Sequence, residues 1–349
     1  MPEIIEIEEF LNLRQSVPIV DVRSPAEYEH GCIPEAHNIP VFSNEERAEI
    51  GTLYKQKGSE KAIERGLEVV EPKLLKMAQN ALETAKNKEL LVHCWRGGMR
   101  SASMADLFET AGIKTKVLKG GYKAYRQYVR DTFKNPLNLK IIGGETGSGK
   151  TEILGELKKL GEQIIDLEAI AHHRGSSYGS IGMEKQPTVE QFENALFDAF
   201  QRLDLSKRIW VEDESRAIGR VFIPEGLWLQ MTQAPVYRVE IPFDIRVQRL
   251  IKDYASAPKE LLLAATERIK KRLGGLDYKN AVEAFEKGDL ATATAIALRY
   301  YDKAYNYPHE QRQFANPSAP LRASVQICRC ADGDPQKNAR IILNRIYST

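Results

Sequence analysis

Short apolar runs alternate with segments of helical periodicity along most of the chain. Between the runs, apolar residues recur every three to four positions, which is typical of helices that bury one face. Alternating strands and helices predict parallel sheets whose faces are covered by helices, so the expected fold class is α/β. The runs short enough to be strands are residues 18–23, 90–94, 115–118, 137–142, 163–166, 208–214 and 236–241.

The length of 349 residues predicts about two domains. The sequence Asn135-Pro136 is typical of a connecting segment, and it separates two groups of predicted strands. We therefore expect a first parallel-sheet domain at residues 1–130, a linker at 131–138 and a second parallel-sheet domain at 139–349. The last third of the second domain is expected to be helical.

Composition narrows the function only slightly. The formal net charge of +2 neither indicates nor opposes binding to a nucleic acid. Four cysteines in a chain of this length do not form a disulfide framework. The first ten residues are acidic, and no run of 18 or more apolar residues is present. We therefore expect a cytoplasmic protein with free thiols and no membrane partner.

The first candidate for chemistry is Cys94, which ends the strand predicted at residues 90–94. Two glycines and two arginines follow within six positions, and then a helical pattern begins. Backbone N–H groups and the helix dipole stabilise an anion at such a turn, and Arg96 and Arg100 add full positive charges. These effects favour the thiolate, the reactive form of cysteine. We predict catalytic roles for these three residues, with a buried structural cysteine as the alternative.

The second candidate is a phosphate-binding loop at residues 144–151, which fits the pattern G-x-x-x-x-G-K-[ST]. A predicted strand precedes the loop and an amphipathic helix follows it, as this motif requires. Glycines let the backbone wrap a phosphate, Lys150 neutralises it, and the Thr151 hydroxyl reaches a Mg²⁺ ion. The predicted phosphate-binding or diphosphate-binding residues are Gly144, Gly147, Ser148, Gly149, Lys150, Thr151 and Arg174.

Two later strands end in carboxylates, at Asp166 and at residues 212–214. In P-loop proteins an acid at a strand end orients Mg²⁺ or its water. Strand register decides which acid faces the site, and we favour Asp213; a solvated strand end is the alternative. A polar loop after Asp166 contains Arg174, whose expected role is to contact phosphate. No tightly bound metal is expected.

The C-terminal third mixes basic and aromatic residues. Residues 267–273 contain four basic side chains, and residues 298–307 interleave tyrosines with arginine and lysine. This mixture suits unpaired bases and phosphates, although the tyrosines could equally seal a helical core. We expect these helices to lie beside the phosphate-binding loop. Arg246 and Arg249, three positions apart, either reach bound phosphates or face solvent.

Residues 3–130 resemble the rhodanese family. The resemblance rests on four separated pieces in the same order: Asp21-Val22-Arg23 with Glu27, residues 31–40, the Cys94 loop, and Lys119-Gly120-Gly121-Tyr122. In that family the loop cysteine carries sulfur or selenium as a persulfide-like adduct. A basic residue often ends the loop, as Arg100 does here.

With residues 173–177 and 191–194 added, nearly the whole chain resembles the bacterial tRNA 2-selenouridine synthase family, in which a rhodanese domain is fused to a P-loop domain. The resemblance implies a transferase acting on the wobble 2-thiouridine of the tRNAs for Lys, Glu and Gln. Geranyl diphosphate would alkylate the 2-thio group, and selenium from selenophosphate would then replace the geranylthio group to give 2-selenouridine.

The same resemblance implies no prosthetic group, Mg²⁺ as a candidate cofactor, and a partner enzyme that supplies selenophosphate. One alternative is a rhodanese-type sulfurtransferase fused to an ATP-dependent small-molecule kinase, which would turn over ATP without tRNA. A second alternative is a tRNA-binding module that keeps both folds without catalysis. The complete P-loop and the presence of Cys94 argue against this second alternative.

Overall fold

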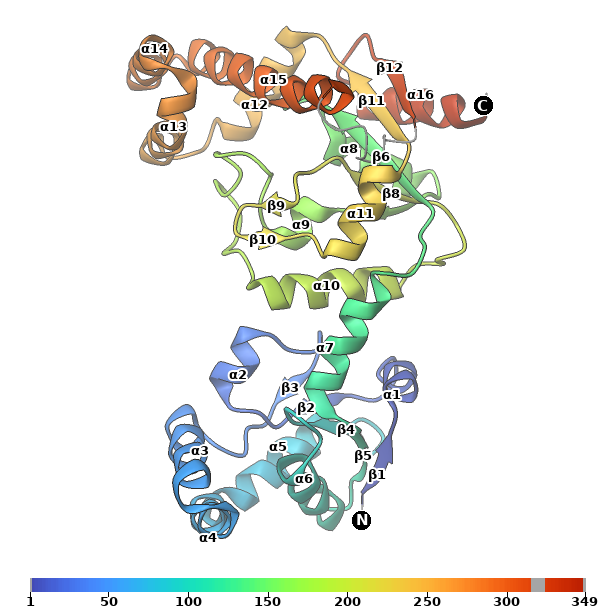
Figure 1. Cartoon of the computed structure of the whole chain (residues 1–349), viewed down its shortest axis with the longest axis vertical. Helices are drawn as coiled ribbons and strands as arrows, with labels where there is room; N and C mark the ends of the chain where they lie inside the picture. The colour runs from blue at the N-terminus through green and yellow to red at the C-terminus, as the bar shows by residue number, and fades with distance from the viewer. Residues whose placement is uncertain (1, 315–323, 348–349) are drawn as a thin grey trace. The chain divides into compact units, whose positions relative to one another are not determined.

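The computed structural model describes residues 2–314 and 324–347, with backbone only for 304–314 and 347. The chain divides into two compact units, residues 1–132 and nearly all of residues 133–349. Each unit contains its own five-stranded sheet, and all strand pairs in both sheets are parallel. The predicted α/β class is therefore confirmed. Figure 1 labels the elements of both units.

The sheet of the first unit has the strand order β1-β5-β4-β2-β3. Its strands are β1 (Glu3–Ile5), β2 (Ile19–Asp21), β3 (His37–Asn38), β4 (Glu89–His93) and β5 (Lys114–Leu118). The central strand β4 is buried along its last four residues because helices cover the sheet, as its continuous apolar run predicts. The helices are α1 (Ile7–Leu13), α2 (Pro25–His30), α3 (Asn44–Lys57), α4 (Ser59–Val70), α5 (Leu74–Thr84), α6 (Met99–Thr110) and α7 (Gly121–Thr132).

The second sheet has the order β12-β11-β6-β8-β7, so β6 lies between β8 and β11. Its strands are β6 (Leu139–Gly144), β7 (Gln163–Ile165), β8 (Ile209–Glu212), β11 (Val236–Glu240) and β12 (Val325–Arg329), and a separate antiparallel pair is formed by β9 (Ala217–Ile218) and β10 (Val221–Phe222). The carboxyl ends of β6 and its neighbours meet at one edge of the sheet, where ligands bind in open α/β folds.

Helices of the second unit fall into two groups. Those interspersed with the strands are α8 (Lys150–Lys159), α9 (Leu167–Ala171), α10 (Val189–Gln201), α11 (Glu225–Gln233) and α16 (Pro335–Tyr347). The others follow β11 in sequence and are α12 (Phe243–Tyr254), α13 (Lys259–Leu273), α14 (Gly275–Glu286) and α15 (Leu290–Phe314). The second group lies together in Figure 1 and packs around a buried apolar core that includes Leu262, Ile269 and Phe285, together with Tyr178 from the segment after α9.

The segment between α7 and β6 is fixed to the second unit. The Gln230 side chain donates to the carbonyl oxygens of Phe133 and Asn135, at 3.0 Å each, and accepts from the N–H of Leu137 at 2.8 Å. Phe133 is buried and packs edge-on against Phe200. Residues 133–137 are therefore held by specific contacts. Within the described residues, no helix combines the length and the apolar character needed to cross a membrane.

Candidate functional site

The Cys94 loop joins β4 to α6 and is held by backbone hydrogen bonds from the start of α7. The N–H of Tyr122 donates to the Cys94 carbonyl oxygen at 2.8 Å, and the N–H of Lys123 donates to that of Trp95 at 3.0 Å. Gly121 adopts a φ of +58°, and a Cβ atom there would lie 2.4 Å from the Cys94 carbonyl oxygen. Only glycine therefore allows the two segments to approach this closely.

The loop stabilises a thiolate at Cys94. Burial opposes ionisation, but a hydrogen bond with the Ser101 hydroxyl, the backbone N–H groups of Arg96 and Ser101 and the positive charge of Arg100 together hold the pKa of the Cys94 thiol below its usual value. Sγ lies 3.3 Å from Ser101 Oγ, which also donates to the Gly98 carbonyl oxygen at 2.9 Å. Because a hydroxyl has one proton, Ser101 can turn from Gly98 to Sγ when the thiol ionises.

The two predicted arginines act differently. Arg100 donates to Glu27 at 2.9 Å, and Glu27 also accepts from the Ser24 N–H at the start of α2. This ion pair fixes the Arg100 side chain near the loop. The Arg96 side chain is exposed, and its contribution to Cys94 is its backbone N–H. The sequence prediction did not include Ser101, although its place in the first turn of α6 is where a side-chain donor to Sγ would be expected.

A buried ion pair supports the loop. Arg23 is fully buried, binds both oxygens of Asp21 at 2.6 to 3.0 Å and donates to the Gly31 carbonyl oxygen at 2.7 Å. Its guanidinium lies 3.8 Å from the centre of the Tyr122 ring. Since Tyr122 also holds the Cys94 carbonyl, this pair braces the loop without reaching Sγ.

The phosphate-binding loop runs from the end of β6 into α8. Gly149 has a left-handed φ of +79° and is the N-cap of α8, so the first N–H groups of the helix point toward the loop. Lys150 Nζ donates to the Gly144 carbonyl oxygen at 3.1 Å and lies across the loop. Ser148 is buried, and its hydroxyl has no partner among the described residues. The loop therefore presents backbone donors and one ammonium group.

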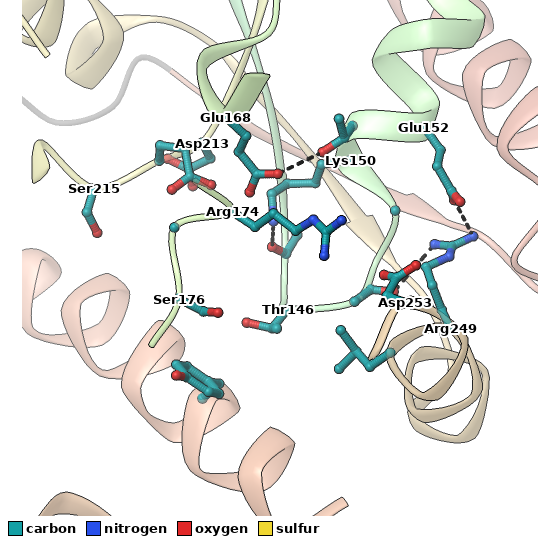
Figure 2. A pocket seen from close by; sticks show the side chains of 18 of the residues that line it. Thr146, Lys150, Glu152, Glu168, Arg174, Ser176, Asp213, Ser215, Arg249 and Asp253 are labelled. Atoms are coloured by element: carbon teal, nitrogen blue, oxygen red, sulfur yellow. Dashed lines mark hydrogen bonds and ion pairs between the residues drawn. The ribbon is translucent and has the colours of Figure 1, made fainter. Parts of the chain in front are cut away.

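A cavity of 510 Å³ opens above this loop (Figure 2). Gly144, Gly147, Gly149, Lys150, Thr151 and Arg174 all line it; Ser148 does not. The Arg174 guanidinium lies 5.8 Å from the centre of the Tyr254 ring, inside the same cavity as Lys150. Arg272 of α13 and Tyr300 and Tyr301 of α15 complete the wall, which confirms that these helices lie beside the loop. The side chains of Tyr305 and Tyr307 lie outside the described part of the structure.

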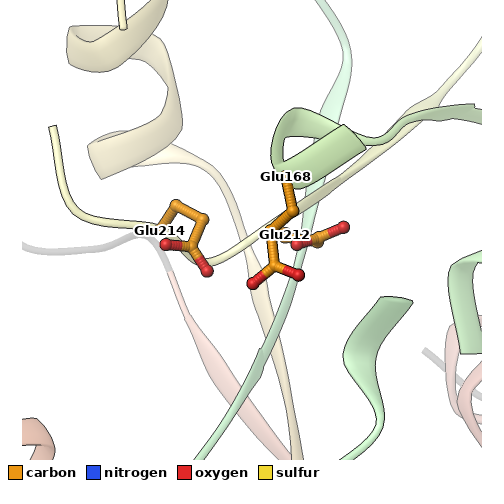
Figure 3. Close-up of side chains that lie close together, drawn as sticks. All are labelled: Glu168, Glu212 and Glu214. Atoms are coloured by element: carbon orange, nitrogen blue, oxygen red, sulfur yellow. The ribbon is translucent and has the colours of Figure 1, made fainter. Parts of the chain in front are cut away.

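Three carboxylates meet beside the loop: Glu168, Glu212 and Glu214 (Figure 3). One oxygen from each lies within 4.8 Å of the others, and Glu168 accepts from the Thr151 hydroxyl at 3.1 Å. Glu212 is fully buried, and neither of its oxygens has a hydrogen-bond partner among the described residues. Oxygen ligands of this kind suit a hard divalent cation such as Mg²⁺, which would neutralise the buried charge.

The pKa values of this cluster follow from its packing. Burial, followed by the charges of the neighbouring carboxylates, raises the pKa of Glu212 well above its usual value. Burial and the charge of Glu168 raise the pKa of Glu214 to about 8. The pKa of Glu168 is also raised, mainly by burial. Without a cation the cluster retains protons near neutral pH, and a bound cation would displace them.

The two acids predicted from the sequence to orient Mg²⁺, Asp166 and Asp213, both lie outside the cluster of three carboxylates. The Asp166 carboxylate accepts from the N–H of Ala169 at 2.8 Å and caps α9. Asp213 lines the cavity, but the cluster is made by its two sequence neighbours and by Glu168. The geometry therefore favours Glu212 and Glu214 over Asp213. Glu168 was not predicted from the sequence, because it lies in α9 and not at a strand end.

Arg246 and Arg249 of α12 support the loop. Arg246 is buried, donates to both oxygens of Asp302 at 2.8 and 2.9 Å, and donates to the Thr146 carbonyl oxygen at 3.2 Å. Arg249 donates to the Gly333 carbonyl oxygen at 2.5 Å and pairs with Glu152 at 3.0 Å. Arg246 thus ties α15 to the phosphate-binding loop, which neither sequence alternative anticipated.

The fold and the two sites define a class of protein: a rhodanese-like domain with an ionisable loop cysteine, joined to a P-loop domain with a phosphate cavity. Two family models match the chain in this order, a rhodanese-like domain at residues 6–128 and the tRNA 2-selenouridine synthase AAA domain at residues 137–318. The chain belongs to the tRNA 2-selenouridine synthase family.

The chain aligns with named relatives over most of its own length and of theirs. The tRNA 2-selenouridine synthase of Marinobacter nauticus is 34% identical over 88% of this chain and 93% of its own. The enzyme of that name from Shewanella pealeana is 34% identical over 84% and 89%. Among solved structures, the N-terminal domain of a Clostridium difficile 630 protein is 39% identical, covers 36% of this chain and 98% of that domain, and has a TM-score of 0.34.

Proposed function

We propose that this chain is a transferase that converts 2-thiouridine at the wobble position of tRNA to 2-selenouridine. The observation that carries the proposal is the pairing of a thiolate-favouring Cys94 loop with a P-loop cavity lined by α13 and α15. Relatives that match 84 to 89% of this chain carry the name tRNA 2-selenouridine synthase. The substrates proposed for the two steps are geranyl diphosphate and selenophosphate, and the tRNAs are those for Lys, Glu and Gln.

In the first step, the 2-thio sulfur of the uridine attacks carbon 1 of geranyl diphosphate. A carbon–sulfur bond forms, the carbon–oxygen bond breaks, diphosphate leaves, and the N3 proton of the base is released. The N–H groups at the start of α8, Lys150 and Arg174 would bind the departing diphosphate. Mg²⁺ held by Glu168, Glu212 and Glu214 would add positive charge at the same place. No hydrolysis of a nucleotide is needed.

An apolar cleft beside the P-loop cavity supports a hydrocarbon substrate. It shares Thr146, Ser176, Leu250, Tyr254 and Tyr301 with the phosphate cavity. The rest of its lining is almost wholly apolar: Tyr178, Ile251, Leu262, Phe285, Leu290, Thr294, Ala297 and Leu298. Its free volume is about 40 Å³, so a ten-carbon chain would enter only if side chains such as Leu250 move.

In the second step, selenium must reach carbon 2 of the modified base. The selenium of selenophosphate forms the new carbon–selenium bond, the geranylthiolate leaves and takes up a proton, and water takes the phosphoryl group as phosphate. We propose the Cys94 loop as the binding site for selenophosphate, because its backbone donors and the charge of Arg100 suit a phosphoryl anion. Cys94 carries no selenium in this step, since a bond from its thiolate to the selenium of selenophosphate would need a two-electron oxidant that the reaction does not supply.

Nucleoside mass spectrometry tests this proposal. The full chain would be incubated with 2-thiouridine-containing tRNA and geranyl diphosphate, and then with selenophosphate. Wild type should give selenouridine, Lys150→Ala should leave 2-thiouridine unchanged, and Cys94→Ala should stop at the geranylated nucleoside. Lys158→Ala on the exposed side of α8 and Cys32→Ala are matched controls that should behave as wild type.

Two results would overturn the proposal. If the mass of no nucleoside changes in any sample, this family activity does not apply to the chain. If ATP is turned over without tRNA and Lys150→Ala abolishes that turnover, the sulfurtransferase–kinase alternative explains the protein better. A product that forms equally in both variants would show that neither site carries the reaction.

A further inference from the structure

A second cavity, of 380 Å³, adjoins the phosphate cavity, and the two share Arg272 and Tyr300 in their walls. The rest of the second cavity comes from the four helices of the C-terminal group: Phe243 of α12, the end of α13, the start of α14, and Arg299, Asp302 and Lys303 of α15. We call it the Arg299 pocket. Its size falls in the range of sites that bind small organic ligands.

The charge of the Arg299 pocket is positive. Arg272, Arg299 and Lys303 line it and are all exposed. Two acids line the pocket, Asp302 and Asp277. Both carboxylate oxygens of Asp302 accept hydrogen bonds from the Arg246 guanidinium. Among the side chains that the structure describes, Arg299 and Lys303 have no ion-pair partner, although exposed Asp277 lies in the same wall. The pocket therefore presents more cationic than anionic groups to an incoming ligand.

Two aromatic side chains, Tyr300 and Phe243, line the pocket together with these charged residues. Tyr300 is partly exposed and separates the two cavities, with its ring 5.0 Å from that of Tyr301. Arg299 lies 5.8 Å from the centre of the Phe243 ring. Rings and guanidinium planes beside unpaired cations are the groups that bind single-stranded nucleic acid, where bases stack and phosphates pair with arginine or lysine.

We propose that the Arg299 pocket binds a nucleotide of the RNA substrate next to the uridine that enters the P-loop cavity; this rests on tRNA being the substrate. Its base stacks on Tyr300 or Phe243, and its phosphate is bound by Arg299 and Lys303. Tyr300 lines both cavities. A neighbouring nucleotide bound in the Arg299 pocket would therefore orient the target uridine toward the phosphate cavity. Arg299 and Lys303 are then positioning residues for RNA, and neither lines the phosphate cavity.

The test is binding of a labelled anticodon stem-loop containing 2-thiouridine to the full chain, measured by fluorescence anisotropy at several salt concentrations. Arg299→Ala should weaken binding about tenfold, the factor expected for loss of one charge-assisted hydrogen bond. It should also reduce the slope of log K against log salt by about 0.7. Lys303→Ala should act in the same direction. Arg329→Ala, which removes an arginine whose side chain is 87% exposed on β12, is the matched control.

A second pair of variants separates stacking from charge. Tyr300→Ala should weaken RNA binding about tenfold, while Tyr300→Phe should bind like wild type because it keeps the ring. Binding of inorganic diphosphate, measured by calorimetry, should stay the same in Arg299→Ala. A circular dichroism melt checks that each variant is folded, and Arg299→Lys, which keeps the charge, should restore most of the affinity if the loss is electrostatic.

The outcomes separate this proposal from the proposed function. If wild type makes selenouridine and Arg299→Ala and Lys303→Ala bind RNA as tightly as Arg329→Ala does, the pocket proposal is wrong and the function stands. If Arg299→Ala loses diphosphate and RNA binding alike, the pocket belongs to the phosphate site and the RNA role is also wrong. If wild type does not bind the stem-loop at all, the proposed function itself fails.

Discussion

Replacing Gly121 with alanine tests whether the start of α7 controls the chemistry of Cys94. A Cβ atom at this position would lie 2.4 Å from the Cys94 carbonyl oxygen and 2.5 Å from the Gly97 nitrogen. Both distances fall about 1 Å short of ordinary van der Waals contact, which begins near 3.4 Å. Both neighbours are backbone atoms, so the clash can be relieved only by moving the loop itself.

The expected cost has two parts. A φ of +58° is unfavourable for alanine by roughly 1 to 2 kcal/mol. Moving the loop also breaks the hydrogen bond from Tyr122 to Cys94, worth about 1 kcal/mol, and displaces the donors around Sγ. We expect Gly121→Ala to lower the free energy of unfolding of the first unit by about 3 kcal/mol and to raise the pKa of the Cys94 thiol.

Gly112→Ala provides a matched control. Gly112 has a φ of +84°, and a Cβ atom there would meet nothing within 4 Å. This variant carries only the conformational cost, so it should lose roughly 1 to 2 kcal/mol and leave the pKa of Cys94 unchanged. The difference in free energy of unfolding between the two variants therefore reports the clash at Gly121, without the cost of placing alanine at a positive φ.

The assay is the rate of alkylation of Cys94 by iodoacetamide, followed by mass spectrometry from pH 5 to pH 10. The midpoint of the pH profile reports the thiol pKa and does not depend on how easily the reagent enters. Wild type and Gly112→Ala should share a midpoint below that of Cys32, whose pKa is raised by burial. Gly121→Ala should shift the Cys94 midpoint upward. An unchanged midpoint would show that the close approach of α7 has no part in activating the thiol.

Four further predictions concern the Cys94 loop, the carboxylate cluster and the Arg246–Asp302 pair. Ser101→Ala should raise the alkylation midpoint of Cys94, since it removes the hydroxyl 3.3 Å from Sγ. An unchanged midpoint would show that the Ser101 hydroxyl does not lower the thiol pKa. Mn²⁺ should raise the melting temperature more at pH 8 than at pH 6, because protons on carboxylates with raised pKa values compete with the cation, and Glu212→Gln should abolish this rise. Without a cation, stability should fall from about pH 5 to pH 8, because Glu214 keeps its proton in the folded state up to about pH 8. Arg246→Ala should cost about 3 kcal/mol, since it leaves Asp302 unpaired, and calorimetry should also show weaker diphosphate binding.

Features encoded in a few consecutive residues could be predicted from the sequence. The strand at Glu89–His93 ends just before Cys94, and the P-loop lies between β6 and α8, because each depends on a local pattern of apolar residues and glycines. The short strand β1 (Glu3–Ile5) was not predicted. Two of its three residues are exposed, so it has no apolar run, and it forms by pairing with β5 far along the chain.

The choice among the acids shows where sequence reasoning ends. Glu212 is the last residue of β8 and pairs in register with Ile142 of β6, which buries its side chain beside the P-loop. Asp213 begins the loop that follows, and its N–H donates to the Ile142 carbonyl oxygen. A run of three acids contains no information about this register. Glu168 joins the cluster from α9, 44 positions before Glu212, so only the folded chain brings them together.

The same reasoning applies to substrate selection. The residues proposed to perform chemistry lie in loops whose sequences can be recognised, because binding a phosphate or a thiolate needs several backbone donors from one short segment. Selection of the RNA depends instead on the helices after β11, where Arg246 of α12 joins Asp302 of α15 and thereby sets the position of Tyr300 and Arg299. Such pairs are 50 or more residues apart and leave no local pattern. Weakening the Arg246–Asp302 pair should therefore disturb RNA binding as well as the phosphate site, which would link substrate choice to catalysis through one buried contact.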